Sequence, residues 1–319
     1  MLTEGTDVET PVIPPALLRD LELMHHYTAY TSLTMADFST FDHIWQNVIP
    51  AEALSHTFLM YGILALTALH IAHDRPQVKD LYTPVALQHY NVAIASFRSA
   101  LKKVDADNCT ALFGFSTILI VLSFAFAQSP SPAQNQSPVD DLIQIFTLLQ
   151  GVRVVLQSAM PWVSKGPLSP LLRRGSVPNS DAARSSIHIP QDFDEALIRL
   201  GGYNERTYET ADSHEMYNQA IQSLRVCVEK VKANPGDRAA AINWLVFLEN
   251  SYVSSLKDNQ PLALVILAHY GIVLNGLRDS WFVQGLGTRV IEVVHRSLSE
   301  KWRPLVHWPV EQVGLRGEP

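Results

Sequence analysis

The sequence has very little cysteine: Cys109 and Cys227 are the only two in 319 residues. They lie far apart and neither belongs to a CxxC pair, so a zinc site built mainly of cysteines is excluded. A disulfide-rich secreted fold is excluded for the same reason. Cys109 opens an apolar run, which indicates a buried thiol rather than a nucleophile.

Basic residues are also scarce and scattered. The 24 lysines and arginines stand against 31 acidic residues, which gives a formal net charge of -7. The only basic doublets are Lys102-Lys103 and Arg173-Arg174. Nucleic-acid binding draws on clustered cations that neutralise phosphates. We therefore expect this chain to bind no nucleic acid by itself.

Motifs for covalent, metal or cofactor chemistry are missing as well. The sequence contains no GxSxG, no HEXXH and no phosphate-binding glycine loop, and Gly285-Leu286-Gly287 follows no predicted strand. His70 and His73 share one face of a predicted helix, but a zinc site needs a third ligand and usually a fourth. We interpret the twelve histidines as ordinary hydrogen-bonding residues, and we expect no metal and no cofactor.

Apolar residues at helical spacing are what the sequence does have. Hydrophobic residues make up 47% of it and charged residues 17%, which is enough for a thick core with some apolar residues left to line a cavity. Because alternating strand patterns are absent, the predicted fold class is all-α: a single domain of about nine to eleven helices around an apolar core with a buried hydrophobic pocket. The predicted helices cover residues 14–35, 42–49, 58–73, 81–104, 111–127, 140–160, 193–200, 210–232, 238–255, 261–277 and 281–302.

The segments outside these helices give the expected domain organisation. Residues 1–15 are predicted to be a disordered lead-in, residues 16–310 a helical ligand-binding domain and residues 311–319 a tail. Residues 128–138 and 164–190 are predicted to be flexible loops. Gly201-Gly202 is interpreted as a helix C-cap, and the stretch LVHWPVEQVGLRGEP is expected to leave helical geometry.

One apolar run tests for a membrane span. Residues Ala111 to Ala127 comprise 17 residues without a charge, whereas a spanning helix needs about 20 apolar residues. Acidic residues precede the run and no basic residues flank it. We interpret the run as a helix buried on all faces and expect no membrane span.

Three predicted helices carry more apolar residues than one packing face needs. We therefore expect a cavity between helix 58–73, helix 111–127 and segment 261–302. Trp281 offers a broad apolar face and one N–H donor, and Gly285 is expected one helical turn later on the same face, where a ligand can approach its backbone. The predicted ligand contacts are Phe58, Tyr61, Leu64, Phe115, Leu119, Trp281, Phe282 and Gly285.

Four stretches together resemble the C-terminal regulatory domain of fungal binuclear zinc-cluster transcription factors, in the sterol-uptake-control branch. They are DLELMHHYTAYTSLTM, the segment from Trp45 to His70 with IPAEALSHTFLMYGILALTALH, the segment from Tyr82 to Leu101 continuing into NCTALFGFSTILIV, and ALVILAHYGIVLN followed by RDSWFVQGLG and HWP. The resemblance covers roughly residues 20–309. It implies an all-helical domain that tends to dimerise and holds a sterol in a deep hydrophobic pocket.

The sequence departs from the family at several points. The six-cysteine DNA-binding cluster has no counterpart among its two cysteines. Leu286 stands where the family usually has a second tryptophan, Thr57 where a proline is common, and Tyr61 where a histidine is common. These departures fall beside the pocket that the resemblance implies, so they bear on its specificity for sterols.

Two functions stay open at this point. The first is a ligand-sensing domain that binds an apolar small molecule, either a sterol, a terpenoid or a polyketide, within the cytoplasm or nucleus and as a homodimer. The second is an enzyme of fungal secondary metabolism, in which a former sensor has been recruited as a cofactor-independent cyclase or isomerase, such as a Diels–Alderase. Such an enzyme would act by positioning a terpenoid or polyketide for reaction. His70, Tyr61 and His269 are the candidates that would polarise such a substrate.

Overall fold

The fold is built from helices alone, as the sequence predicts. The computed structural model describes residues 13–128, 137–173, 189–207 and 211–315, and within them it contains fourteen α-helices and no β-strand. The all-α fold class is therefore confirmed, although the number of helices exceeds the expected nine to eleven. Three of the fourteen are short helices of four to six residues, namely α2 (Ser32–Met35), α3 (Ile49–Ala53) and α15 (His307–Gln312).

The N-terminal group of helices surrounds α4 (Thr57–Asp74). Thirteen of the eighteen residues of α4 are buried, because α1, α3, α5 and α6 all pack against it. The first predicted helix is interrupted: α1 (Pro15–His26) passes through the π-helical turn η1 (Tyr27–Thr31) into α2. A second π-helical turn, η3 (Ile44–Val48), leads into α3, and α5 (Lys79–Ala100) follows α4.

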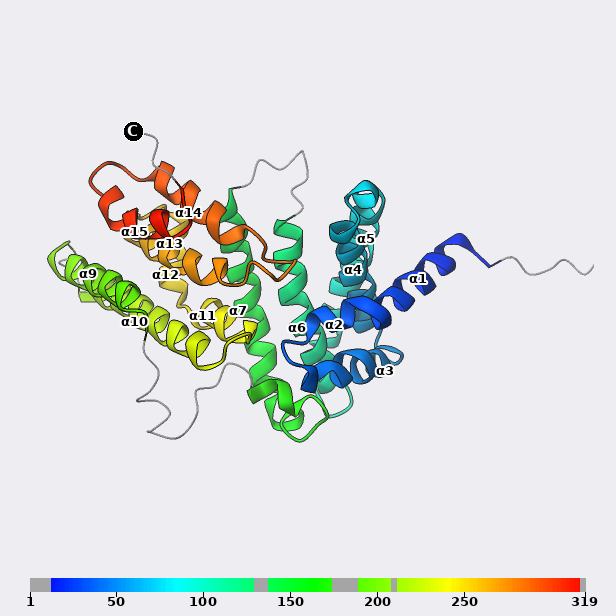
Figure 1. Ribbon diagram of the computed structural model, residues 1–319. Helices are drawn as coiled ribbons and strands as arrows, with labels where there is room; N and C mark the ends of the chain where they lie inside the picture. Colours follow the sequence, from blue (N-terminus) through cyan, green and yellow to red (C-terminus); the bar gives the residue numbers. More distant parts are fainter. Residues whose placement is uncertain (1–12, 129–136, 174–188, 208–210, 316–319) are drawn as a thin grey trace, which may run out of the picture.

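Two long helices, α6 (Cys109–Ala127) and α7 (Pro138–Val163), lie in the middle of the molecule (Figure 1). α6 packs against α4 and α7, and α7 in turn packs against α11, α12 and α14. These contacts make α6 and α7 the link between the N-terminal group and the C-terminal group.

A capping box begins α7. The Ser137 side chain accepts a hydrogen bond from the backbone N–H of Val139, and the Asp140 carboxylate accepts one from the Ser137 N–H.

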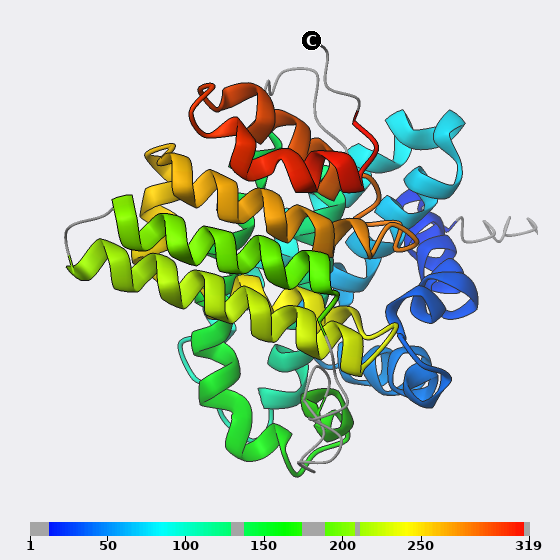
Figure 2. The same cartoon turned by 60° about the vertical axis from the view of Figure 1, so that its left-hand side comes forward.

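The C-terminal group contains the remaining helices. Figure 2 shows α9 and α10 running side by side, with α13 beside them and α14 and α15 beyond it. α13 and α14 cross where the backbones of Gly271 and Gly287 come close together. The helices of this group are α9 (Gln191–Thr207), α10 (Ala211–Ala233), α11 (Arg238–Phe247), α12 (Asn250–Lys257), α13 (Pro261–Asn275), α14 (Leu286–Ser297), the 3-10 turn η6 (Arg303–Val306) and α15.

Several predicted boundaries are wrong. α9 runs through Gly201-Gly202 to Thr207, so these glycines are not a C-cap. Residues 238–255 form two helices, because the backbone is extended at Leu248 and Glu249. Residues 305–312, which were expected to leave helical geometry, belong to η6 and α15.

Some predicted segments lie outside the described residues. These are residues 1–12 of the lead-in, residues 129–136 and 174–188 of the two predicted loops, and residues 316–319 of the tail. The described part of the second loop contains the 3-10 turn η5 (Ser169–Arg173).

α6 is the helix in the described residues that is long and apolar enough to cross a membrane. The rest of the protein buries 72% of its most apolar window. The burial of α6 between α4 and α7 therefore accounts for its apolar composition.

Candidate functional site

A pocket of about 260 Å³ lies between α6, the C-terminal end of α7 and α11. We call it the α6–α11 pocket. Only three of its lining residues, Thr117, Arg238 and Asn243, are polar. The apolar lining residues are Met35, Trp45, Phe113, Ile120, Val121, Met160, Leu171, Leu172, Ala239, Ile242, Val246, Phe247 and Phe282.

Helical spacing explains how two of the walls arise. α6 contributes residues 113, 117, 120 and 121, and α11 contributes residues 239, 242, 243 and 246. Residues three and four positions apart lie on one face of a helix. Each helix therefore turns one continuous, mostly apolar stripe toward the pocket.

An ion pair neutralises the one charged side chain that lines the pocket. The Arg238 guanidinium contacts the fully buried carboxylate of Asp37, and the Arg238 backbone N–H donates to Asp37 Oδ2 at 3.2 Å. Burial lowers the pKa of Arg238 to about 10. The guanidinium also lies 5.4 Å from the ring centre of Phe282. The pocket therefore presents a compensated pair rather than a free positive charge.

Two of the residues that line this pocket carry a polar group without a hydrogen-bond partner among the described residues. Trp45 is fully buried, and its Nε1–H has no hydrogen-bond partner among the described residues. Its backbone carbonyl accepts a hydrogen bond from the Tyr27 hydroxyl at 2.9 Å, which holds the residue in place. The carboxamide of half-buried Asn243 also makes no recorded hydrogen bond in the described part of the chain. An unpaired buried donor costs about 1–3 kcal/mol, so a ligand oxygen that accepted from Trp45 would recover that energy.

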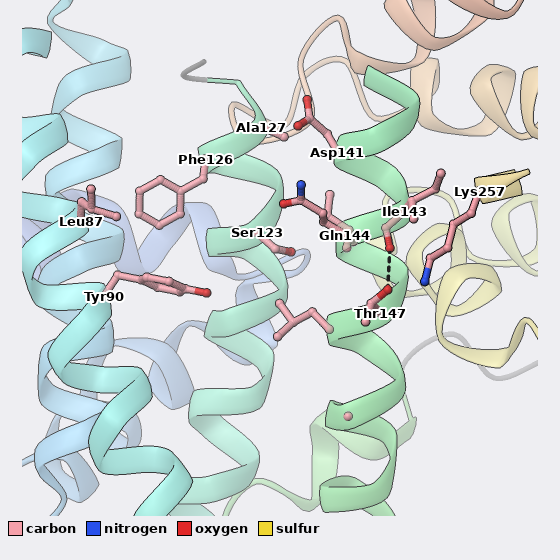
Figure 3. Close-up of a pocket in the computed structure, with 13 residues that line it drawn as sticks. Leu87, Tyr90, Ser123, Phe126, Ala127, Asp141, Ile143, Gln144, Thr147 and Lys257 are labelled. Carbon is pink, nitrogen blue, oxygen red and sulfur yellow. Dashed lines mark hydrogen bonds between the residues drawn. The ribbon is translucent and has the colours of Figure 1, made fainter. Parts of the chain in front are cut away.

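A larger hollow of about 860 Å³ lies along α5, α6 and α7, and we call it the α5–α7 groove (Figure 3). Tyr90 of α5 and Phe126 of α6 meet there edge to face, with ring centres 5.1 Å apart. Beyond α6, the exposed polar residues Gln144, Thr147 and Lys257 belong to the same lining. Ligand sites combine a mostly apolar lining with few polar groups, so the smaller α6–α11 pocket is the better candidate.

The pocket has two of the three walls expected of the predicted cavity. α6 lines it, and so does Phe282 of the expected segment 261–302, but no residue of α4 does. α4 takes no part because the helices that pack against it bury it. Phe282 is the single predicted contact that lines the pocket.

Four other predicted contacts belong to the packed core: Phe58, Leu64, Phe115 and Leu119 are each at most 3% exposed. The rings of Phe58 and Phe115 lie 5.7 Å apart and both pack against Phe97. Phe58 and Phe115 therefore pack against each other in the core, and none of the four residues lines the α6–α11 pocket.

The three candidates for polarising a substrate lie in three different places. Tyr61 stacks on His89 with ring centres 5.5 Å apart. His269 is buried, with its Nδ1 at 2.9 Å from the carbonyl oxygen of Val265, and it lines a separate cavity of about 310 Å³. His70 lies beside Trp281, with ring centres 5.1 Å apart. None of the three lines the α6–α11 pocket.

Trp281 and Gly285 do not share a helical face, so that prediction is wrong. α14 begins only at Leu286, and Gly285 precedes it with a left-handed φ of 72°. Gly285 is exposed, and no atom lies within 4 Å of the position that its Cβ would take. Trp281 instead donates its Nε1–H to Thr34 Oγ1 at 3.1 Å.

Sequence reasoning missed the polar part of the pocket. Asp37 and Arg238 are 201 positions apart, and no spacing rule connects residues at that separation. The sequence predicted a helix that begins at residue 238, where α11 lies, but it did not predict what faces this helix across the pocket.

Comparison with known proteins gives the family. Residues 22–168 match the domain described as the fungal specific transcription factor domain. Residues 22–168 thus form a fungal specific transcription factor domain. The resemblance identified from the sequence is therefore confirmed, and the matched region includes the α6 wall of the pocket, Trp45 and Met160.

Individual relatives agree with this assignment. A Zn(2)-C6 fungal-type transcription factor of Gibberella zeae is 26% identical over 316 residues, covering 93% of this chain and 62% of the relative. Sterol uptake control protein 2 of Candida albicans is 35% identical over 119 residues, which is 37% of this chain and 16% of the relative. The protein of that name from Saccharomyces cerevisiae is 30% identical over 122 residues, covering 38% and 13%. The fungal specific transcription factor domain of this chain is thus related to sterol uptake control proteins, and the chain spans less than two thirds of each of these relatives.

Proposed function

We propose that this chain is the ligand-sensing part of a fungal transcriptional regulator that acts in the nucleus, and that the α6–α11 pocket binds a compact apolar molecule carrying one neutral oxygen. The observation that carries the proposal is the pairing of a mostly apolar lining with the unpartnered Nε1–H of Trp45. Terpenoids, polyketides and sterols all have an apolar body with a hydroxyl or carbonyl oxygen.

The charge at the pocket favours a neutral ligand. Arg238 is already paired with the buried carboxylate of Asp37. A carboxylate on the ligand would have to compete with Asp37 for the guanidinium and would itself lose hydration. A hydroxyl or carbonyl group only needs the N–H of Trp45 or the amide of Asn243.

The volume of the pocket favours a compact ligand. Its volume of about 260 Å³ lies just below the range of roughly 300–1,000 Å³ for small-molecule sites. Met160 and Phe247 line it and are 42% and 57% exposed, so these two side chains can turn outward to enlarge it. A sesquiterpenoid-sized molecule fits with less displacement than a complete sterol.

The position of the pocket supports a role in sensing. Its walls come from the N-terminal group through Met35 and Trp45 and from the C-terminal group through α11 and Phe282. A ligand that contacts both groups stabilises the arrangement in which they lie together. Such differential binding is the physical requirement for a ligand-dependent regulator.

The test is direct binding with a filled-pocket variant. Farnesol and ergosterol, as probes, should raise the melting temperature of the wild-type chain, with farnesol giving the larger shift. Val246→Phe should abolish the shift, because Val246 lines the pocket and is 7% exposed. The matched control is Leu148→Phe in the α5–α7 groove, which should respond as the wild type does. Loss of binding in Leu148→Phe with retention in Val246→Phe would move the site to the groove and contradict the proposal.

A further inference from the structure

A second cluster of polar side chains lies apart from the α6–α11 pocket, where the end of α1 meets α4. It comprises His26, Thr31, His70 and Asp74, and we call it the two-histidine cluster. The Thr31 hydroxyl lies 3.2 Å from His26 Nδ1 and 3.0 Å from His70 Nδ1. The other ring nitrogen of His70, Nε2, lies 3.3 Å from Asp74 Oδ2. None of these residues lines the pocket.

The cluster has the donor set of a metal site. A ring nitrogen of His26, a ring nitrogen of His70 and a carboxylate oxygen of Asp74 all lie within 4.8 Å of one another. Ligand atoms at about 2.0–2.1 Å from a tetrahedral zinc ion are about 3.3 Å apart. The distance from His70 Nε2 to Asp74 Oδ2 already equals that spacing, and the remaining ligand atoms need to move by about 1.5 Å at most.

Local backbone geometry explains why His26 and Thr31 meet. The π-helical turn η1 follows His26 directly and ends at Thr31. A π turn places residues five apart next to each other, and such turns occur frequently at functional sites. His70 and Asp74 are one turn apart on α4, so two helices supply the three ligands.

Thr31 orients the imidazole rings. Metal-binding histidines usually hold their second ring nitrogen in a hydrogen bond, which fixes the ring and the tautomer. Thr31 does this for His70 Nδ1 and leaves Nε2 facing Asp74. Trp281 covers the cluster, because its ring centre lies 5.1 Å from that of His70.

The surroundings favour the neutral, metal-binding form of both histidines. Burial lowers the pKa of His26, and burial lowers the pKa of His70 to about 4 despite the opposing charge of Asp74. Neutral imidazole is the form that ligates a metal. The Asp74 side chain is 45% exposed, which gives an ion a path from solvent and leaves room for a water ligand.

We propose that His26, His70 and Asp74 bind one divalent transition-metal ion of the zinc type, with solvent completing the coordination. This site was not expected from the sequence, because the third ligand, His26, is 44 residues before the nearest of the other two. Sequence spacing showed only His70 and His73, and His73 is exposed and lies outside the group.

The test is a titration of the tag-free, chelator-treated chain with Zn²⁺ by calorimetry, and with Co²⁺ by visible absorption. We expect one ion per chain and the intense cobalt absorption of four-coordinate geometry. Asp74→Asn should weaken Zn²⁺ binding at least tenfold, since it removes a ligand charge at a half-exposed position. His26→Gln should do the same, and His25→Gln, which changes the exposed neighbouring histidine, should bind as the wild type does.

A melting experiment separates a metal site from a purely hydrogen-bonded cluster. Zn²⁺ should raise the melting temperature of the wild type and of His25→Gln but not that of Asp74→Asn. If His26→Gln does not fold, the comparison between Asp74→Asn and His25→Gln decides the matter. Absence of stoichiometric Zn²⁺ binding to the wild type, or equal affinity in Asp74→Asn and His25→Gln, would overturn the proposal and leave the cluster as a hydrogen-bonded contact between α1 and α4.

Discussion

The crossing of α13 and α14 makes a quantitative prediction for Gly287→Ala. A Cβ at position 287 would lie 2.3 Å from the carbonyl oxygen of Gly271 and 2.6 Å from the backbone nitrogen of Asn275. Both atoms belong to the backbone of α13, so no side-chain rotation can relieve the contact. The two helices must separate by about 1 Å to restore a normal contact distance.

The cost of this separation follows from the packing around it. Inserting a methyl group into a close-packed interior costs about 1–3 kcal/mol. Alanine regains up to about 1 kcal/mol over glycine inside a helix, but Gly287 is only the second residue of α14, where the gain is smaller. We expect a net destabilisation of about 1–2 kcal/mol. For a domain of this size that corresponds to a fall in melting temperature of about 2–8 °C.

Thermal unfolding followed by far-UV circular dichroism measures the effect. Gly271→Ala should also destabilise, because its Cβ would lie 2.7 Å from Ile291 Cγ1 and 3.1 Å from the carbonyl oxygen of Gly287. The control is Gly151→Ala in the interior of α7, where nothing lies within 4 Å of the added Cβ. That variant should be as stable as the wild type or up to about 1 kcal/mol more stable. If Gly287→Ala melts together with Gly151→Ala, the close backbone crossing is not a feature of the protein.

Three further predictions concern pH, ligand recognition and DNA. Burial lowers the pKa of His269 to about 4 from its usual 6.5. The unfolded chain therefore binds the proton first, and the free energy of unfolding decreases as the pH falls from 6.5 toward 4. Urea unfolding at about pH 5 should show a loss of about 2 kcal/mol from this group, and His269→Phe should remove that loss. Trp45→Phe keeps an aromatic ring but removes the N–H, so it should weaken farnesol binding by about tenfold, the contribution of one hydrogen bond. Its affinity for the corresponding hydrocarbon should stay unchanged. Equal losses of affinity for both probes would contradict the role of Trp45 as a donor. With a net charge of -7, the chain alone should show no sequence-selective shift of duplex DNA at about 0.15 M salt, and a salt-resistant shift in a gel assay would contradict this expectation.

The sequence predicted best the helices that are buried on all faces, because almost all of their residues are apolar. α4 and α6 were placed within two residues at each end, because nearly every position in them is apolar and only a helix enclosed by others accommodates that. The same signal cannot say which neighbours enclose a helix. The cavity was therefore placed beside α4, although α4 has no free face.

Local rules failed where tertiary contacts override them. Gly201-Gly202 reads as a C-cap, but α9 continues past it because Leu200 and Asn204 are buried on the same stripe, and two glycines cost only about 1 kcal/mol each. Residues 305–312 were expected to leave helical geometry, yet Pro304 and Pro309 are both accommodated, because each stands in the first turn of its helix, where no backbone N–H is needed.

The candidate site was the least predictable part. Phe282, one of the predicted ligand contacts, lines the α6–α11 pocket, but it stands in the turn before α14 and not on a helix as the sequence predicted. Asp37, Trp45 and Arg238 come together only through the packing of the N-terminal group against α11, and each is unremarkable in its own segment.

The turn between α13 and α14 has a consequence for how the two proposed sites would communicate. Trp281 and Phe282 are consecutive residues whose rings stand nearly perpendicular, at 86°. One ring covers the two-histidine cluster and the other lines the α6–α11 pocket. A displacement of this short segment therefore changes both sites at once. Thermodynamic linkage then requires that the two effects are equal. The factor by which a bound metal ion changes the affinity for the apolar ligand is the factor by which the ligand changes the affinity for the metal.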